Sequence, residues 1–208
     1  MKTRRIALID YRAGNLTSVK KAFAAIDADL FVPEAPVDVR DAAAIVVPGV
    51  GHFAATQALT SDWVDVIRAG VDAGRPLLGI CLGMQWLYEG SEEAPGAAGL
   101  GVLAGQCYRL PSEANGTSVK IPHVGWNALD IERADSIVDG VTPGAQVYFT
   151  HSFVGPITSD TVDVTEHGRP FASVVQRAHV AGVQFHPEKS GDVGIRILRN
   201  FLRLLQKS

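Results

Sequence analysis

The chain has 208 residues, of which 47% are hydrophobic, and its formal net charge is −3. This length is enough for one well-buried core, so we expect a single domain over residues 1–208, and the scattered basic residues argue against nucleic acid or an anionic membrane as a partner. With no export signal, no run of about 18 apolar residues and no disulfide framework, we expect a cytoplasmic protein with reduced thiols.

Strand-like and helix-like patterns alternate along the first half of the chain. Aliphatic and β-branched runs predict strands, and apolar residues at helical spacing predict helices, with Asn15 and Ser61 as N-caps. The predicted strands are residues 4–11, 29–33, 43–48 and 75–80, the second and third of them buried. The predicted helices lie in residues 16–26 and 61–74, the second with Gly74 just past its end. Such alternation favours a parallel sheet covered by helices.

The second half is built from short extended runs separated by Gly, Pro, Asp and Ser, which are typical of antiparallel additions or hairpins. These runs are residues 105–110, 119–126, 145–153, 161–167, 171–177 and 180–185. Residues 194–208 predict an amphipathic helix with an apolar face of Ile195, Leu198, Leu202 and Leu205, and residues 89–99 predict a mobile loop. The fold class predicted is therefore α/β, with a mostly parallel central sheet flanked by helices and an added antiparallel β portion.

The segment Gly-Ile-Cys-Leu-Gly, residues 79–83, places Cys81 between a predicted strand and a run of helix-forming composition, residues 82–89. This is the nucleophile-elbow pattern with cysteine in place of serine, in which a sharp strand-to-helix turn exposes the side chain at a helix N-terminus. The helix dipole there favours the reactive thiolate. The alternative is a buried cysteine in a glycine-rich turn. Cys107 has no paired base and is expected to be a small core residue.

The segment GVQFHPEKS offers a base for this thiol, because His186 follows a predicted strand and Glu188 lies two residues later. We expect Pro187 to hold the segment extended at an exposed strand end, so that Glu188 orients the imidazole toward Cys81. A lone histidine at a strand end is more often a surface or core residue. The interpretation therefore depends on the combination with Cys81.

The segment VVPGVGHFA contains Gly49, Gly51 and Ala54 in the spacing of a loose dinucleotide-binding fingerprint, which favours an NAD-dependent oxidoreductase as a rival interpretation. That fingerprint also needs an acidic residue at the end of the next strand, where this chain has Cys81. The same glycines supply exposed backbone N–H groups, as an oxyanion hole beside the elbow requires. A plain tight turn is the simplest alternative.

Several motifs, in one order across most of the chain, carry a resemblance to a known family. They are PGVGHF (48–53), GICLGMQ (79–85), HVGWN (123–127), YFTHSF (148–153) and GVQFHPEKS (182–190). With them the chain resembles the triad-type, or class I, glutamine amidotransferases, which have a flavodoxin-like fold, and in particular the glutaminase subunits of imidazole glycerol phosphate synthases. Phe153 stands where a tyrosine is common in the family.

The resemblance implies a role for each motif. Cys81 would attack the side-chain amide of glutamine, His186 would pass a proton to the leaving ammonia, and Glu188 would hold His186. The oxyanion would be stabilised by a set of backbone amides from Gly49, Val50, Gly51 and Leu82. The amino-acid end of the substrate would be bound by Gln85, His151, Ser152 and Phe153. The resemblance implies neither a cofactor nor a metal ion.

The resemblance also implies a (β/α)₈ cyclase that forms a heterodimer with this chain, receives the ammonia and makes imidazole glycerol phosphate and an aminoimidazole carboxamide ribotide for histidine biosynthesis. We expect it to dock at Asn15, Trp126, Tyr148 and Lys189, unless Trp126 is a core residue. Glycines in the loop 49–51 allow a resting state with a carbonyl where an N–H is needed, so the isolated chain is expected to be a poor glutaminase. Two alternatives stay open: a glutaminase for another ammonia-using synthase, and a non-catalytic binding module.

Overall fold

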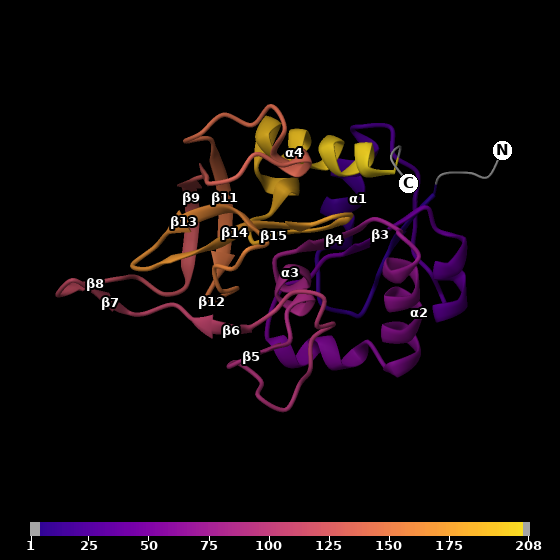
Figure 1. Cartoon of the computed structure of the whole chain (residues 1–208), viewed down its shortest axis with the longest axis horizontal. Coiled ribbons are helices and arrows are strands. Elements are labelled where there is room, and N and C mark those ends of the chain that lie inside the picture. The colour runs from indigo at the N-terminus through magenta and orange to yellow at the C-terminus, as the bar shows by residue number, and fades with distance from the viewer. Residues whose placement is uncertain (1–4, 206–208) are drawn as a thin grey trace.

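The computed structural model describes residues 5–205. An eight-stranded sheet has the strand order β10-β13-β14-β15-β4-β3-β1-β2. Figure 1 labels its central part, from β13 to β3. The strands from β15 to β2 are parallel, and β14, β13 and β10 extend the sheet in antiparallel pairing, which confirms the predicted fold class. These strands are β1 (Ile6–Leu8), β2 (Leu30–Phe31), β3 (Ala44–Val47), β4 (Leu77–Ile80), β10 (Asp130–Ile131), β13 (Thr161–Glu166), β14 (Pro170–Arg177) and β15 (Val180–Val183).

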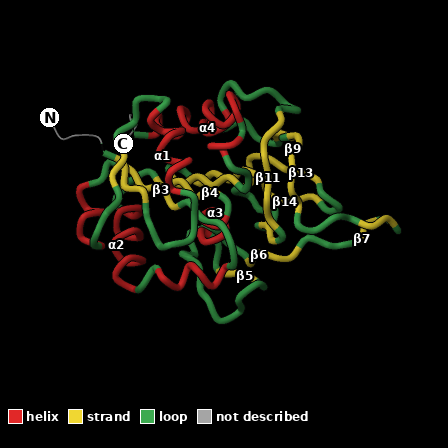
Figure 2. Tube along the Cα trace, turned by 180° about the vertical axis from the view of Figure 1, so that it is seen from behind, coloured by secondary structure: helices red, strands yellow, loops and turns green. Residues whose placement is uncertain are grey.

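Helices cover both faces of this sheet. Helices α1 (Leu16–Ala24) and α4 (Gly191–Leu204) lie on one face, and α2 (Ser61–Asp72) and α3 (Leu82–Leu87) lie on the other (Figures 1 and 2). Successive side chains of the central strands therefore enter different clusters: Val46 belongs to the cluster of α1 and α4, whereas Val47 belongs to the cluster of α2 and α3. Burial on both faces explains why these strands are continuous apolar runs.

The helix ends agree with the sequence prediction only in part. Asn15 caps α1, since its side-chain oxygen accepts a hydrogen bond from the Ser18 amide at 3.2 Å. The predicted Ser61 cap is wrong, because Ser61 is already helical and follows Thr60 at the N-cap position. Helix α4 begins at Gly191, ahead of the predicted start, and residues 206–208 of the predicted helix lie outside the described range. Its most buried apolar residues are Ile197, Leu198, Phe201 and Leu204, so most of the predicted face lies at the edge of the buried stripe.

The remaining strands of the second half form small sheets. They are the pair β9 (His123–Ala128) and β11 (Gln146–His151), the sheet of β12 (Phe153–Val154), β6 (Gln106–Arg109) and β5 (Gly90–Ser91), and the pair β7 (Glu113–Ala114) and β8 (Thr117–Ser118). The β7–β8 hairpin projects from the body of the molecule (Figure 1). Strand β5 lies within residues 89–99, so part of the predicted mobile loop is paired.

The antiparallel pairing predicted for residues 180–185 is wrong for one of their two neighbouring strands. Strand β15 is antiparallel to β14 but parallel to β4, and so joins the two parts of the large sheet. The predicted burial of residues 29–33 is also wrong, because β2 is an edge strand and its two residues are half-buried. Periodicity reports how many faces of a strand are covered, but does not identify its neighbours.

The carboxyl ends of β3, β4 and β15 meet at one edge of the sheet, where open α/β folds bind their ligands. The chain leaves β3 into the loop 49–51, β4 into Cys81 and β15 into the segment 184–189. The fold thus brings together the three segments that the sequence singles out for chemistry. Among the residues that the structure describes, no helix is long and apolar enough to cross a membrane.

Candidate active site

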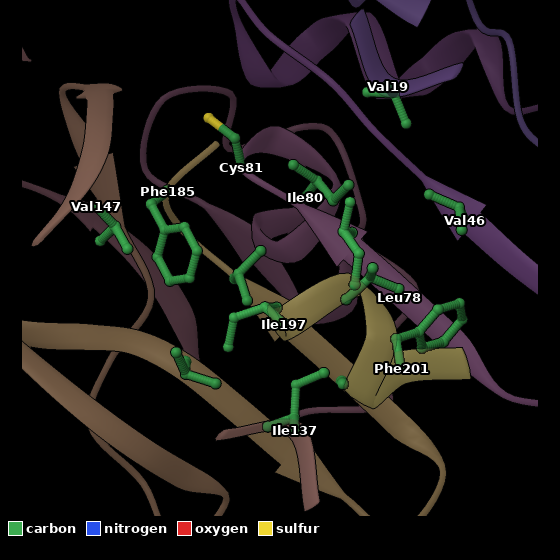
Figure 3. Close-up of a cluster of buried hydrophobic side chains, with 14 of the residues drawn as sticks. Val19, Val46, Leu78, Ile80, Cys81, Ile137, Val147, Phe185, Ile197 and Phe201 are labelled. Carbon is green, nitrogen blue, oxygen red and sulfur yellow. The ribbon is translucent and has the colours of Figure 1, made fainter. Parts of the chain in front are cut away.

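Cys81 occupies the turn between β4 and α3, with a φ of 53° in the left-handed region. The flanking glycines are needed for this turn, because a Cβ at Gly83 would clash with the Val47 carbonyl, and one at Gly79 would lie 2.6 Å from the Gly83 oxygen. Figure 3 shows the Cys81 sulfur pointing away from Leu78 and the rest of the hydrophobic cluster. The strained turn therefore separates the thiol from the core that holds its backbone.

His186 and Glu188 form a buried pair next to this turn. His186 Nδ1 lies 2.8 Å from Glu188 Oε1, and the two side chains are only 3% and 4% exposed. The expected extended segment at an exposed strand end is wrong, because residues Pro187–Lys189 form a 3₁₀ turn, η4, that brings the carboxylate back to the ring. Ser190 fixes this turn, since its hydroxyl donates to the His186 carbonyl at 2.6 Å and accepts from the Tyr148 amide at 3.0 Å.

The electrostatic surroundings favour the charged form of His186. Burial alone would lower the pKa of the imidazole, but Cys81 and Glu188 outweigh this effect and raise the pKa to about 10. The Nε2 atom is buried and makes no hydrogen bond of standard geometry within residues 5–205. Cys81 and Glu188 therefore favour the imidazolium form of His186, in which a proton on Nε2 is available for transfer.

A cavity of about 260 Å³ opens beside Cys81, smaller than the roughly 300–1,000 Å³ typical of pockets for drug-sized ligands. Its wall contains Gly51, Cys81, Leu82, Gln85, Glu93, Pro122, Thr150, His151, Ser152 and Phe153. The structure thus places most predicted oxyanion and substrate residues around one small space. Gly49 and Val50 are absent from the wall that these described residues form.

His151 faces the cavity as a neutral side chain. Burial and the neighbouring His123 lower its pKa well below the ordinary value, and its Nε2 atom lies 3.1 Å from His123 Nδ1. His123 itself stacks on His167 with ring centroids 4.0 Å apart, and burial lowers its pKa to about 4. Sequence reasoning missed His123, although it lies at the start of the HVGWN motif.

Two buried glutamines lie under the thiol. The side-chain nitrogen of Gln85 donates to the Phe153 carbonyl at 2.7 Å and to Gln184 Oε1 at 3.1 Å, and Gln184 Nε2 donates to Cys81 Sγ at 3.6 Å. Sequence reasoning assigned no role to Gln184. The signal was present, however, since Gln184 precedes His186 by two residues and the period of an extended strand puts both side chains on one side.

The glycine loop after β3 lies against the elbow with its hydrogen-bonding groups in use. The Leu82 amide donates to the Gly49 carbonyl at 3.3 Å, and the Val50 amide donates to the Ala13 carbonyl at 3.1 Å. Gly51 has a φ of +98°, which favours glycine. In this structure the Leu82 amide, a predicted oxyanion donor, therefore already donates its hydrogen bond to a protein carbonyl.

Residues predicted to face a partner lie on the surface near the cavity. Trp126 is 57% exposed, which excludes its assignment to the core. Its ring packs edge-on against the Tyr148 ring, with the ring centroids 6.1 Å apart. Lys189 Nζ lies 5.5 Å from the centre of the Tyr148 ring, and Val124 on the same strand as Trp126 is 53% exposed. We call Val124, Trp126, Tyr148 and Lys189 the aromatic patch. Asn15 is exposed at the N-cap position of α1, a helix that contacts η4.

The patch adjoins the cavity, because Val124 pairs with Thr150, a residue of the cavity wall, across β9 and β11.

The sequence model of the family described as "Glutamine amidotransferase class-I" matches residues 7–205, so fold and site together define a class I glutamine amidotransferase. Two relatives narrow this class, both called "Imidazole glycerol phosphate synthase subunit HisH". The one from Deinococcus radiodurans is 42% identical, over 96% of this chain and 94% of its own length, and the one from Syntrophotalea carbinolica is 43% identical, over 94% and 98%. The chain belongs to the HisH family, the glutaminase subunits of imidazole glycerol phosphate synthase.

Solved structures support the fold. The chain resembles a structure described as "Crystal structure of glutamine amidotransferase", with a TM-score of 0.74 and 20% identity over 96% of this chain and 98% of that one. It also resembles "Structure of PurLQS from Thermotoga maritima", with a TM-score of 0.72 and 17% identity over 99% and 100%. Membership of the HisH family, and not the likeness of fold, argues against the dinucleotide-binding interpretation of the glycine loop.

Proposed function

We propose that the chain, acting as one domain over residues 1–208, hydrolyses glutamine to glutamate and ammonia through Cys81, His186 and Glu188. The observation that carries this proposal is the thiol at a strained turn, in the wall of a small cavity, next to a buried histidine–carboxylate pair. Such a combination supplies a nucleophile, a proton donor and a group that fixes the donor's orientation.

The first half-reaction forms a thioester. The Cys81 thiolate attacks the side-chain carbonyl carbon of glutamine, and the carbonyl oxygen takes up the negative charge. His186 then gives its Nε2 proton to the amide nitrogen, the C–N bond breaks and ammonia leaves. Glu188 stays ionised and stabilises the imidazolium before this transfer.

The second half-reaction restores the thiolate. Water gives a proton to His186 Nε2 while its oxygen attacks the thioester carbon, and the C–S bond breaks to release glutamate. In both steps the developing oxyanion needs N–H donors, each worth about 3 kcal/mol. We expect the Leu82 amide and the loop 49–51 to provide these donors after a rearrangement that turns the Gly49 carbonyl away from the Leu82 amide.

The proposed partner is a (β/α)₈ cyclase that docks on the aromatic patch and Asn15 as a heterodimer in the cytoplasm. Ammonia released from glutamine next to Cys81 would then enter the barrel, where imidazole glycerol phosphate and the aminoimidazole carboxamide ribotide are made. Docking would favour the loop conformation that frees the Leu82 amide. A thousandfold activation needs only about 4 kcal/mol of differential stabilisation.

The experiment is steady-state glutamate release by the chain alone, with the cyclase, and with the cyclase plus its nucleotide ligand. We expect slow release alone and an increase at each addition. Full activity from the chain alone, unchanged by either addition, would refute the switching mechanism. Release stimulated only by a different ammonia-using synthase would support the alternative assignment to that synthase.

A further inference from the structure

A continuous line of buried groups joins strand β12 to the proposed nucleophile, Cys81. It runs from the Phe153 carbonyl through the side chains of Gln85 and Gln184 to Cys81 Sγ, with distances of 2.7, 3.1 and 3.6 Å. The Gln184 side chain is fully buried and Gln85 is 4% exposed. Buried amides of this kind are costly unless their hydrogen bonds are made, so their orientation is strongly constrained.

The chemistry of the partners fixes that orientation without ambiguity. A backbone carbonyl only accepts hydrogen bonds, so the Gln85 atom facing Phe153 must be the nitrogen. The same nitrogen faces Gln184, so the Gln184 atom at that contact must be the oxygen. The other end of the Gln184 amide, its NH₂ group, consequently faces the Cys81 sulfur.

We infer that Gln184 is a positioning residue that holds the Cys81 sulfur and stabilises its thiolate form. Phe153 and Gln85 fix the orientation of the Gln184 amide, so that its NH₂ group faces the sulfur. This inference rests on the proposed function, in which Cys81 is the nucleophile. A neutral N–H donor strengthens its hydrogen bond when the sulfur becomes negative, and it competes for no proton in the reaction. Gln184 therefore assists both thiolate attack and thiolate departure, while His186 alone moves protons.

The sulfur has a second partner besides Gln184. The Cys81 S–H donates to the Thr150 carbonyl at 4.0 Å, and this hydrogen bond is lost when the thiol ionises, whereas the Gln184 N–H can still donate to the thiolate. The other titratable groups acting on the sulfur are His186 and Tyr11, with Glu188 acting through His186. All three stay in place when Gln184 alone is replaced.

The test is Gln184→Leu, which removes the amide at similar size, with Gln176→Leu as the matched control. Gln176 is also a buried glutamine with several hydrogen bonds, but its partners are Ser136, Ile137 and Ala178, away from the cavity. Alkylation of Cys81 by iodoacetamide is followed against pH by mass spectrometry. Glutamate release is measured with the cyclase present.

For Gln184→Leu we expect the alkylation midpoint to rise by about one pH unit and kcat at neutral pH to fall by up to about tenfold, with KM nearly unchanged. Higher pH should recover part of the lost kcat. Gln176→Leu should leave the midpoint unchanged. Should Gln184→Leu not fold, Gln184→Glu keeps the size and the acceptor for Gln85, and its carboxylate should raise the midpoint further.

An unchanged midpoint in a folded Gln184 variant would overturn the inference, as would the same shift in Gln176→Leu. Failure of the proposed function would give a different result. In that case Cys81→Ala would still release glutamate, independently of the alkylation midpoints of the Gln184 variants.

Discussion

At the scale of single residues, the two cysteines differ in surroundings more than in burial. Cys81 stands at a strained turn facing a cavity, whereas Cys107 lies within β6, fully buried, and burial raises the pKa of its thiol. We therefore expect Cys81→Ala to abolish glutamate release with the fold retained, and Cys107→Ala to retain most activity. A glutamine-like affinity label mapped by mass spectrometry provides the check. Modification of Cys107 in preference to Cys81 would contradict the assignment.

Replacing His186 or Glu188 should affect activity and stability differently. His186→Ala removes the proton carrier and leaves the Glu188 carboxylate buried without its partner, so we expect a rate loss of about 10²–10⁴ and a stability loss of about 3–5 kcal/mol. Glu188→Gln keeps a hydrogen-bond acceptor of the same size, so both losses should be smaller. Had the pair stood at an exposed strand end, neither variant would change stability.

These losses are measured as glutamate release with the cyclase and as urea unfolding of the chain. Equal rate losses for the two variants would show that the roles of His186 and Glu188 are misassigned.

At the scale of elements, β13 carries a buried acid that makes the sheet sensitive to pH. Asp163 is fully buried, and burial raises its pKa to about 7, although Ser173 donates a hydrogen bond to it. In an unfolded chain the pKa is about 3.9, so between these values the folded state binds more protons. The free energy of unfolding should therefore fall as pH rises from about 4 to 7, by up to about 4 kcal/mol, and then level off.

Asp163→Asn keeps the shape of the side chain and removes this titration. We expect its free energy of unfolding, measured in urea from pH 4 to 8, to lack the decline assigned to Asp163 in the parent chain. The exposed Asp65→Asn serves as the control and should follow the parent curve. If the curve of Asp163→Asn also ran parallel to the parent curve, Asp163 would be ionised in the folded state at low pH and the assignment would be wrong.

Elements whose signals are local could be predicted from the sequence. The buried runs of β3 and β4, the Asn15 cap and the Cys81 turn all follow from side-chain type and spacing. The parallel pairing of β15 with β4 could not, because the run 180–185 is equally apolar in either direction. The η4 turn was missed for a related reason: Pro187 restricts the residue before it but permits a 3₁₀ turn after it.

At the scale of the whole molecule, the site is assembled from segments far apart in sequence. The meeting of the loop 49–51 with Cys81 could be predicted, because each follows a predicted parallel strand and the carboxyl ends of parallel strands share one edge. The arrival of the segment 184–189 at this edge could not be predicted from strand direction, because it depends on the parallel pairing of β15 with β4. The hydrogen bond from the Leu82 amide to the Gly49 carbonyl could not, since a glycine loop permits either orientation of its peptide groups. The line from Phe153 to Cys81 also joins different strands and is invisible to local patterns.

The surface next to the cavity gives the last prediction. An exposed tryptophan and valine beside a half-buried tyrosine resemble the aromatic centre of a protein interface, where a few residues carry most of the binding energy. We expect Trp126→Ala to weaken cyclase binding by about 30-fold or more and Val124→Ala to weaken it less. Binding is measured by calorimetry or by titrating the activation of glutamate release.

Val37 provides the matched control for Val124. It is 57% exposed, close to the 53% of Val124, but it lies in the 3₁₀ segment Pro36–Asp41, outside the aromatic patch. Val37→Ala should therefore bind and respond to the cyclase like the parent chain. If docking turns the loop 49–51, saturating cyclase should restore the same maximal rate to Val124→Ala, because only the affinity has changed. Equal weakening by both valine variants would place the docking surface elsewhere.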